Sequence, residues 1–142
     1  MTQKADTLFT NAIVLTMDGK LNQYDPGAVV VKGDSIVAVG PEAEITKEYS
    51  ADEVIDCGGK VLMPGLVNAH THVPMTLLRG LADDLRLDVW LMGYMLPVER
   101  EFVSPEFVRL GTSLACAEQI RSGVTTFNDM YFFEDDIAQA TA

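Results

Sequence analysis

Apolar positions in the first sixty residues form short runs that alternate with turn residues. Two of these runs, 28–31 and 36–39, flank a turn that contains Gly33, and this spacing predicts a β-hairpin. Other runs predict strands at 8–9, 12–15 and 54–56 and a helical turn at 42–49. The pattern therefore predicts a small, essentially all-β unit that ends near Gly59.

The apolar spacing changes after this point, and its clearest prediction is a helix from Ser104 to Gly123. Ser104 is a favourable N-cap, Pro105 suits the first helical position, and Gly123 can adopt the left-handed conformation that ends a helix. Apolar residues recur at helical spacing at positions 107, 108, 110, 114, 115, 117 and 120. This segment is the strongest helix signal in the chain.

Strand signals flank this helix at 61–73 and 124–127. A strand, a helix and a second strand in that order predict a βαβ unit with a parallel sheet. Residues 134–142 then predict the start of a second covering helix. A two-stranded parallel sheet cannot cover both of its faces, so either another chain completes the sheet or the sequence is part of a longer protein, which we favour. We also expect this chain to leave apolar surface uncovered. The predicted organisation is a β-rich segment at 1–59 and an α/β segment at 60–142, both incomplete.

Composition and charge narrow the classes of partner. The 142 residues are 48% hydrophobic and carry 21 acidic against 10 basic side chains, which gives a net charge of −11. Such a charge repels phosphate backbones and anionic lipids, so nucleic acid and membrane surfaces are not expected as partners. No apolar run is long enough to cross a bilayer, and the first residues lack an apolar signal segment, which favours a cytoplasmic location.

The chain has two histidines, His70 and His72, and both follow the apolar run 63–69. Residues two apart in a strand point to the same side and lie ~6.6 Å apart, so both imidazoles can converge on one cation. Active sites of parallel α/β barrels are built at the carboxyl ends of strands, although such a histidine pair also occurs by chance. Asn68 and Asp129 are candidates to support the pair, and Asp129 is equally explained as a turn residue.

The residues around this pair resemble a known family. The stretch 64–72, followed by Pro74-Met75, Leu78-Arg79-Gly80, residues 82–85 and Trp90-Leu91, is similar to the amidohydrolase superfamily. Within it, the similarity is greatest to the branch of S-adenosylhomocysteine and 5'-methylthioadenosine deaminases, which also includes chlorohydrolases and guanine-deaminase-like enzymes. The resemblance covers essentially the whole chain. It implies an α/β fold in which a small β-sandwich segment precedes the first βαβ unit of a (β/α)8 barrel.

The resemblance also implies roles for individual residues. His70 and His72 would be the metal ligands from the first barrel strand, for one zinc ion or alternatively iron. The family's remaining ligands and its acid/base residues have no counterpart in this chain, so no catalytic residue is assigned. Glu99 would bind the ribose hydroxyls of a substrate, unless it is a solvated charge at a helix end. Trp90 would line an apolar substrate pocket, unless it belongs to the buried face of a short helix.

Hydrolytic deamination of an adenine-type nucleoside by the intact enzyme is the function that these residues imply. The isolated chain is expected to be inactive. The alternatives are a chlorohydrolase or a guanine- or cytosine-deaminase-like enzyme of the same superfamily, and a non-catalytic fragment. The expected partner is a small nucleoside or heterocycle. The sequence leaves open whether the protein forms a homo-oligomer.

Overall fold

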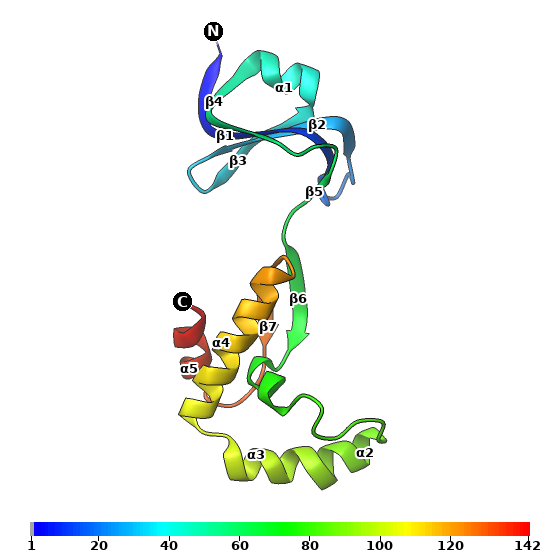
Figure 1. The fold of residues 1–142 in the computed structure, drawn as a ribbon, viewed down its shortest axis with the longest axis vertical. Coiled ribbons are helices and arrows are strands. Elements are labelled where there is room, and N and C mark those ends of the chain that lie inside the picture. The colour runs from blue at the N-terminus through cyan, green and yellow to red at the C-terminus, as the bar shows by residue number, and fades with distance from the viewer. Residues whose placement is uncertain (1) are drawn as a thin grey trace. The chain divides into compact units, whose positions relative to one another are not determined.

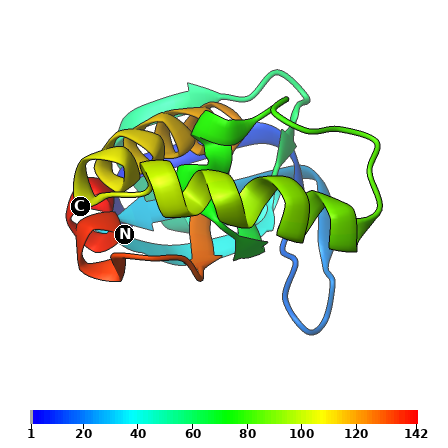
Figure 2. The same ribbon diagram turned by 90° about the horizontal axis from the view of Figure 1, so that it is seen from below.

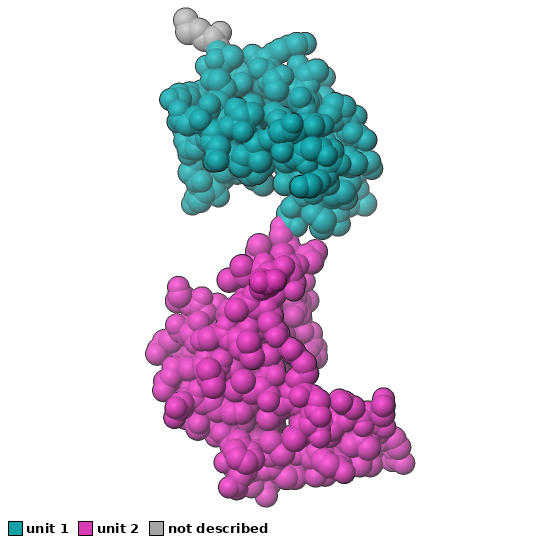
Figure 3. All heavy atoms as spheres, viewed as in Figure 1, with its two compact units in different colours: residues 1–64 teal, residues 65–142 magenta. Residues whose placement is uncertain are grey.

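The computed structural model describes residues 2–142, which divide into two compact units, residues 2–64 and 65–142 (Figure 3). The division lies between Pro64 and Gly65, later in the chain than the expected position near Gly59. The reason is that Val61–Leu62 add a short strand to the sheet of the first unit.

Unit 1 is one mixed sheet with a short helix (Figure 1). Its elements are β1 (Gln3–Leu15), β2 (Gln23–Lys32), β3 (Ser35–Pro41), α1 (Glu42–Glu48), β4 (Tyr49–Asp56) and β5 (Val61–Leu62). The strand order is β3-β2-β1-β4, with β5 also paired to β1. β2 and β3 form the predicted antiparallel hairpin, in which Lys32 pairs with Ser35 and Gly33 has a φ of 60°. The hairpin and the helical turn are therefore confirmed.

The sheet of unit 1 carries two hydrophobic clusters. Ala5, Leu8, Ala28, Val30 and Ile45 form a core in which Ile45 is contributed by α1. A second cluster is built around Ala12, Val14 and Val29. Residues 2–64 thus form one sheet, and the strands of a second sheet that would complete a sandwich are not among them.

Unit 2 contains the expected βαβ unit (Figure 1). Its elements are β6 (Leu66–Thr71), the 3-10 helix η1 (Val73–Leu78), α2 (Leu87–Trp90), the π-helix η2 (Leu91–Met95), α3 (Leu96–Phe102), α4 (Pro105–Arg121), β7 (Val124–Asp129) and α5 (Glu134–Thr141). β6 and β7 pair in parallel, and α4 connects them. The segments α2, η2 and α3 follow one another as one long helix (Figure 2). The expected long connection after β6 is therefore largely helical.

Helix α4 begins and ends where its sequence signals predict. The Ser104 Oγ accepts a hydrogen bond of 3.2 Å from the backbone N–H of Phe107, and Pro105 is the first helical residue. Gly123 follows the helix with a φ of 77°. The side chains of Val108, Thr112 and Ala115 are buried, and the core that they join includes Val73 and Ile137.

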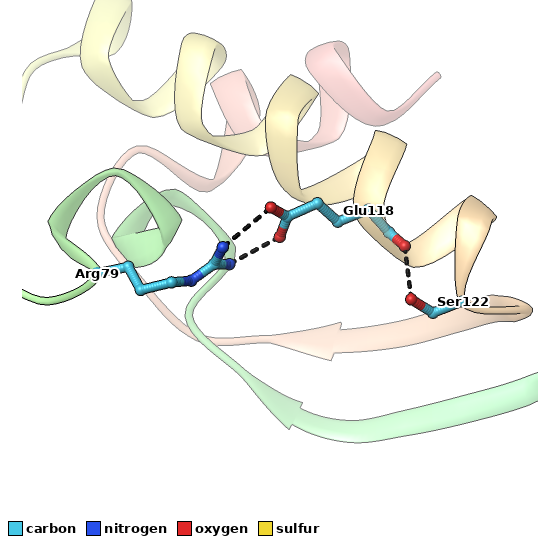
Figure 4. Close-up of polar contacts among 3 residues, drawn as sticks. All are labelled: Arg79, Glu118 and Ser122. Atoms are coloured by element: carbon cyan, nitrogen blue, oxygen red, sulfur yellow. Dashed lines mark hydrogen bonds and ion pairs between the residues drawn. The ribbon is translucent and has the colours of Figure 1, made fainter.

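A paired arginine and glutamate tie η1 to α4 (Figure 4). Arg79 donates from Nη1 and Nη2 to the two carboxylate oxygens of Glu118, at 3.0 and 2.7 Å. These hydrogen bonds lower the pKa of Glu118. On the same helix, the Ser122 hydroxyl donates to the Glu118 backbone carbonyl at 2.8 Å. The pair is exposed to solvent, so it orients the two elements more than it stabilises them.

Self-association of the isolated chain is expected, because unit 2 leaves large apolar side chains in water. Ile120, Met130 and Val67 are 75%, 70% and 67% exposed, and Leu110 and Leu114 of the predicted apolar stripe are 62% and 42% exposed. Large apolar side chains that are exposed in this number favour association, because extensive apolar surface is normally covered in a stable protein. Size-exclusion chromatography with light scattering measures this, and a monodisperse monomer that unfolds cooperatively would contradict it.

Candidate metal centre

The two histidine rings converge at the carboxyl end of β6. His70 is in the strand, and His72 follows its last residue and precedes η1. The Nε2 atoms of the two rings lie 3.3 Å apart, with ring centroids 5.1 Å apart and planes at 81°. Pro74 lies in the first turn of η1, where the chain turns away directly after His72. The alternation of β6 and this turn therefore bring the two imidazoles to the same place.

The separation of the two nitrogens suits a shared cation. Two imidazole nitrogens that each lie about 2.0 to 2.1 Å from a tetrahedral zinc ion are about 3.3 to 3.4 Å apart by simple trigonometry. The observed Nε2 separation of 3.3 Å matches this spacing. His70 is exposed and His72 is half-buried, so neither residue is enclosed in the core. As a donor set, the pair fits a borderline-soft divalent metal.

A backbone carbonyl orients the ring of His72. Its Nδ1 lies 2.5 Å from the carbonyl oxygen of Met130, which can only accept a hydrogen bond. The neutral ring is therefore the tautomer with its proton on Nδ1, and Nε2 keeps its lone pair for a metal. The sequence could not predict this contact, because every residue has a backbone carbonyl and the residue type of Met130 therefore carries no signal. Only the pairing of β6 with β7 brings the carbonyl of Met130 to this place.

Asp129 and Asn68 hold backbone rather than the imidazole rings. Asp129 Oδ1 accepts a hydrogen bond of 2.8 Å from the backbone N–H of Val73, and Oδ2 is buried with no partner among the described residues. Burial raises the pKa of Asp129, while the bond from Val73 acts in the opposite direction. Asn68 Oδ1 accepts from the N–H of His70 at 3.4 Å. Both side chains thus fix the chain around the histidines.

Glu99 is half-buried on α3 and is held by a tyrosine from the end of β7. The Tyr131 hydroxyl donates a hydrogen bond of 2.9 Å to Glu99 Oε1. Burial, and secondarily this carboxylate, raise the pKa of Tyr131, so its hydroxyl keeps its proton. Glu99 also lines a cavity of about 340 Å³ with Leu96, Arg100, Val103, Phe132 and Phe133. Tyr131 was not singled out from the sequence, although its place just after a parallel strand is a signal for function.

Trp90 lies apart from Glu99. It is half-buried and lines a different cavity, of about 360 Å³, which includes Met75, Arg79 and Met95. Met95 is 2% exposed and belongs to the core, whereas Met92 is 67% exposed. The structure therefore connects His70, His72, Tyr131 and Glu99 through direct contacts, and Trp90 lines a separate cavity.

The histidine pair is only part of a metal site. Within residues 2–142, no group of three or more histidine, cysteine, aspartate or glutamate side chains is placed to hold a metal ion. Catalytic zinc sites in proteins use three protein ligands. A further ligand has to come from outside these residues if the pair holds such an ion.

Comparison with known proteins identifies the family. The model of the family described as "Amidohydrolase family" matches residues 61–142, which include the whole of unit 2. The chain belongs to the amidohydrolase family. In unit 1, residues 27–49 match the "Imidazolonepropionase-like composite domain, bacteria".

Relatives with assigned activities cover this amidohydrolase chain almost completely. It is 50% identical over 137 residues to the 5-methylthioadenosine/S-adenosylhomocysteine deaminase of Syntrophobacter fumaroxidans, a match that covers 96% of this chain and 31% of that protein. It is 50% identical over 136 residues to the 5'-deoxyadenosine deaminase of Methanosarcina mazei, covering 96% of this chain and 30% of that one. The chain therefore spans about a third of the length of these relatives.

A solved structure supports the same relationship. The adenosine deaminase from Xanthomonas campestris with bound zinc superimposes with a TM-score of 0.90 and 43% identity, over 99% of this chain and 32% of that one. The fold is thus the mixed α/β fold of an amidohydrolase, in which a β-rich segment precedes the first βαβ unit of the barrel. Among residues 2–142, the helices are all too short or too polar to span a membrane.

Proposed function

We propose that this chain is the N-terminal portion of a metal-dependent amidohydrolase that hydrolytically deaminates an adenine-type nucleoside. The observation that carries the proposal is the convergence of two imidazole Nε2 atoms, 3.3 Å apart, at the carboxyl end of β6. The 50% identity to relatives named as deaminases of 5-methylthioadenosine and of 5'-deoxyadenosine supports the substrate class. In this proposal, unit 1 begins the β-sandwich domain and unit 2 begins the barrel.

His70 and His72 would hold the metal, for which zinc is the first candidate and iron the second. When bound, the ion acts as a Lewis acid that activates water for attack near neutral pH. The role of this chain is to present both imidazoles as neutral donors. The Met130 carbonyl does this for His72, because it accepts a hydrogen bond from the Nδ1–H and so leaves the lone pair of Nε2 free.

Glu99 and Trp90 would bind the substrate. A carboxylate accepts two hydrogen bonds from a vicinal diol, which is the polar group that distinguishes a ribose from a free base. Trp90 would supply an apolar wall from its own cavity beside Met75 and Met95. The isolated chain is expected to be inactive, because two imidazoles are one ligand short of the three typical of catalytic zinc.

The proposal is tested in a completed enzyme. The completed enzyme is a fusion protein in which the present chain replaces the matched 31% of the Syntrophobacter fumaroxidans relative. The rest of the fusion is the part of that relative that follows the matched region. The proposal predicts that the purified completed enzyme contains metal and converts 5'-methylthioadenosine to its inosine analogue with release of ammonia. A soluble, folded, metal-loaded completed enzyme that releases no ammonia from this nucleoside would contradict it.

Glu99→Gln separates nucleoside substrates from sugar-free ones. The change keeps the size of the side chain but weakens its hydrogen bonds from a diol, since bonds to charged groups are worth about 1.5 to 3 kcal/mol. We expect the KM for 5'-methylthioadenosine to rise by about 10-fold or more, while the rate with adenine as a free base stays the same. Initial rates at varied substrate concentration measure this. Equal effects on both substrates would favour a sugar-free substrate, as in the chlorohydrolase and guanine-deaminase-like alternatives.

A further inference from the structure

Three consecutive residues at the end of β7 make separate contacts with the candidate site. Asp129 accepts from the N–H of Val73, the Met130 carbonyl accepts from the ring of His72, and the Tyr131 hydroxyl donates to Glu99. The backbone N–H of Met130 also donates to the carbonyl of Thr71 at 3.3 Å. The segment 129–131 therefore links the histidine pair at the carboxyl end of β6 with Glu99 of α3.

Tyr131 is the member of this segment that reaches between the two groups. Its ring centroid lies 6.3 Å from that of His72, with the planes tilted by 42°. Its hydroxyl lies 2.9 Å from Glu99 Oε1. The ring of Phe132 packs edge-on against it at 5.1 Å, and the Tyr131 side chain contacts the core of unit 2. A ring held on several sides keeps its hydroxyl in a fixed place, so it can fix the carboxylate as well.

We propose that Tyr131 is a positioning residue that sets the substrate specificity of this site, by holding the Glu99 carboxylate at a fixed distance from the histidine pair. One hydroxyl uses only part of the acceptor capacity of a carboxylate, which has about four lone-pair sites, so the remainder is available to a diol. The fixed distance then selects ligands in which a sugar and the reacting ring carbon are correctly spaced. This inference rests on the proposed function, because it assigns a role relative to a nucleoside.

The geometry favours this role over one in packing alone. A half-buried tyrosine hydroxyl needs a hydrogen-bond partner in any case, and here that partner is a side-chain carboxylate of α3 and not a nearby backbone carbonyl. The Tyr131 hydroxyl, which phenylalanine lacks, donates its hydrogen bond to the carboxylate that is proposed to bind the substrate. Tyr131→Phe removes that hydroxyl and keeps the ring against His72 and Phe132.

The test compares Tyr131→Phe, Glu99→Gln and the double variant in the completed enzyme, with 5'-methylthioadenosine and adenine as the two probes. We expect Tyr131→Phe to raise the KM for the nucleoside by about tenfold, the effect of one hydrogen bond to a charged group, with kcat nearly unchanged. Adenine should be processed as before. In the Glu99→Gln background, the second change should add little, since both act through one contact. Tyr49→Phe in unit 1 is the matched control and should change neither constant.

The outcomes separate this inference from the proposed function. If Glu99→Gln raises the nucleoside KM but Tyr131→Phe does not, or if the two effects multiply, the positioning role is wrong and the proposed function stands. If Tyr131→Phe impairs adenine and the nucleoside equally, its role is structural and the inference fails. If the completed enzyme neither turns over nor binds 5'-methylthioadenosine in equilibrium dialysis, the proposed function and this inference both fail.

Discussion

Replacing Gly111 with alanine is expected to destabilise unit 2 by about 1 to 3 kcal/mol, the usual cost of forcing extra atoms into a close-packed contact. Gly111 is buried in α4 where that helix meets η1. A Cβ at this position would lie 2.6 Å from the Pro74 carbonyl oxygen and 2.8 Å from its Cα. These are backbone atoms, so no rotation of a side chain can relieve the contact, and α4 or η1 has to move.

Gly93→Ala is the matched control for this change. Gly93 lies in the helical segment η2, and a Cβ there would have no atom within 4 Å. Alanine in a helix is favoured over glycine by about 0.5 to 1 kcal/mol, so this variant should be neutral or more stable. Urea unfolding of the completed enzyme, followed by circular dichroism, compares the two. Equal midpoints for Gly111→Ala and the parent would show that the contact of α4 with η1 is looser than described.

His70→Ala and His72→Ala are each expected to lower turnover of 5'-methylthioadenosine by more than about 100-fold. Loss of a group that only supports a metal ligand costs up to about 100-fold, and loss of a ligand itself should cost more. Each variant leaves one imidazole of the pair, and the metal content should fall in parallel. Ser113→Ala, an exposed position on α4, is the control and should retain both. Activity and metal content are measured on the same preparations. Full activity in either histidine variant would remove that residue from the metal site.

Local signals in the sequence were sufficient for the regular elements. The β2–β3 hairpin follows from a glycine turn between two apolar runs, and α4 follows from Ser104, Pro105 and Gly123, because caps and turns act within a few residues. The convergence of His70 and His72 also follows locally, from strand alternation together with the turn at Pro74 directly after the pair.

Contacts between distant segments could not be predicted in the same way. The contact of the Met130 carbonyl with His72 spans 58 positions, and that of Tyr131 with Glu99 spans 32. Both depend on how β7 and α3 pack, which no short pattern encodes. The pairing of Val61–Leu62 with β1 moved the end of unit 1 for the same reason. The π-helical turn at Leu91–Met95 could not be predicted either, because the spacing of its apolar residues does not distinguish it from an α-helix.

The proposed function depends on one metal ion shared by the rings of His70 and His72. The most direct measurement is X-ray diffraction from crystals of the zinc-loaded completed enzyme at the zinc absorption edge, which locates the ion independently of any assumed ligand. We expect an anomalous peak about 2.0 to 2.1 Å from the Nε2 atoms of both residues. A zinc peak at another place, with either ring turned away from it, would contradict a shared metal site at His70 and His72.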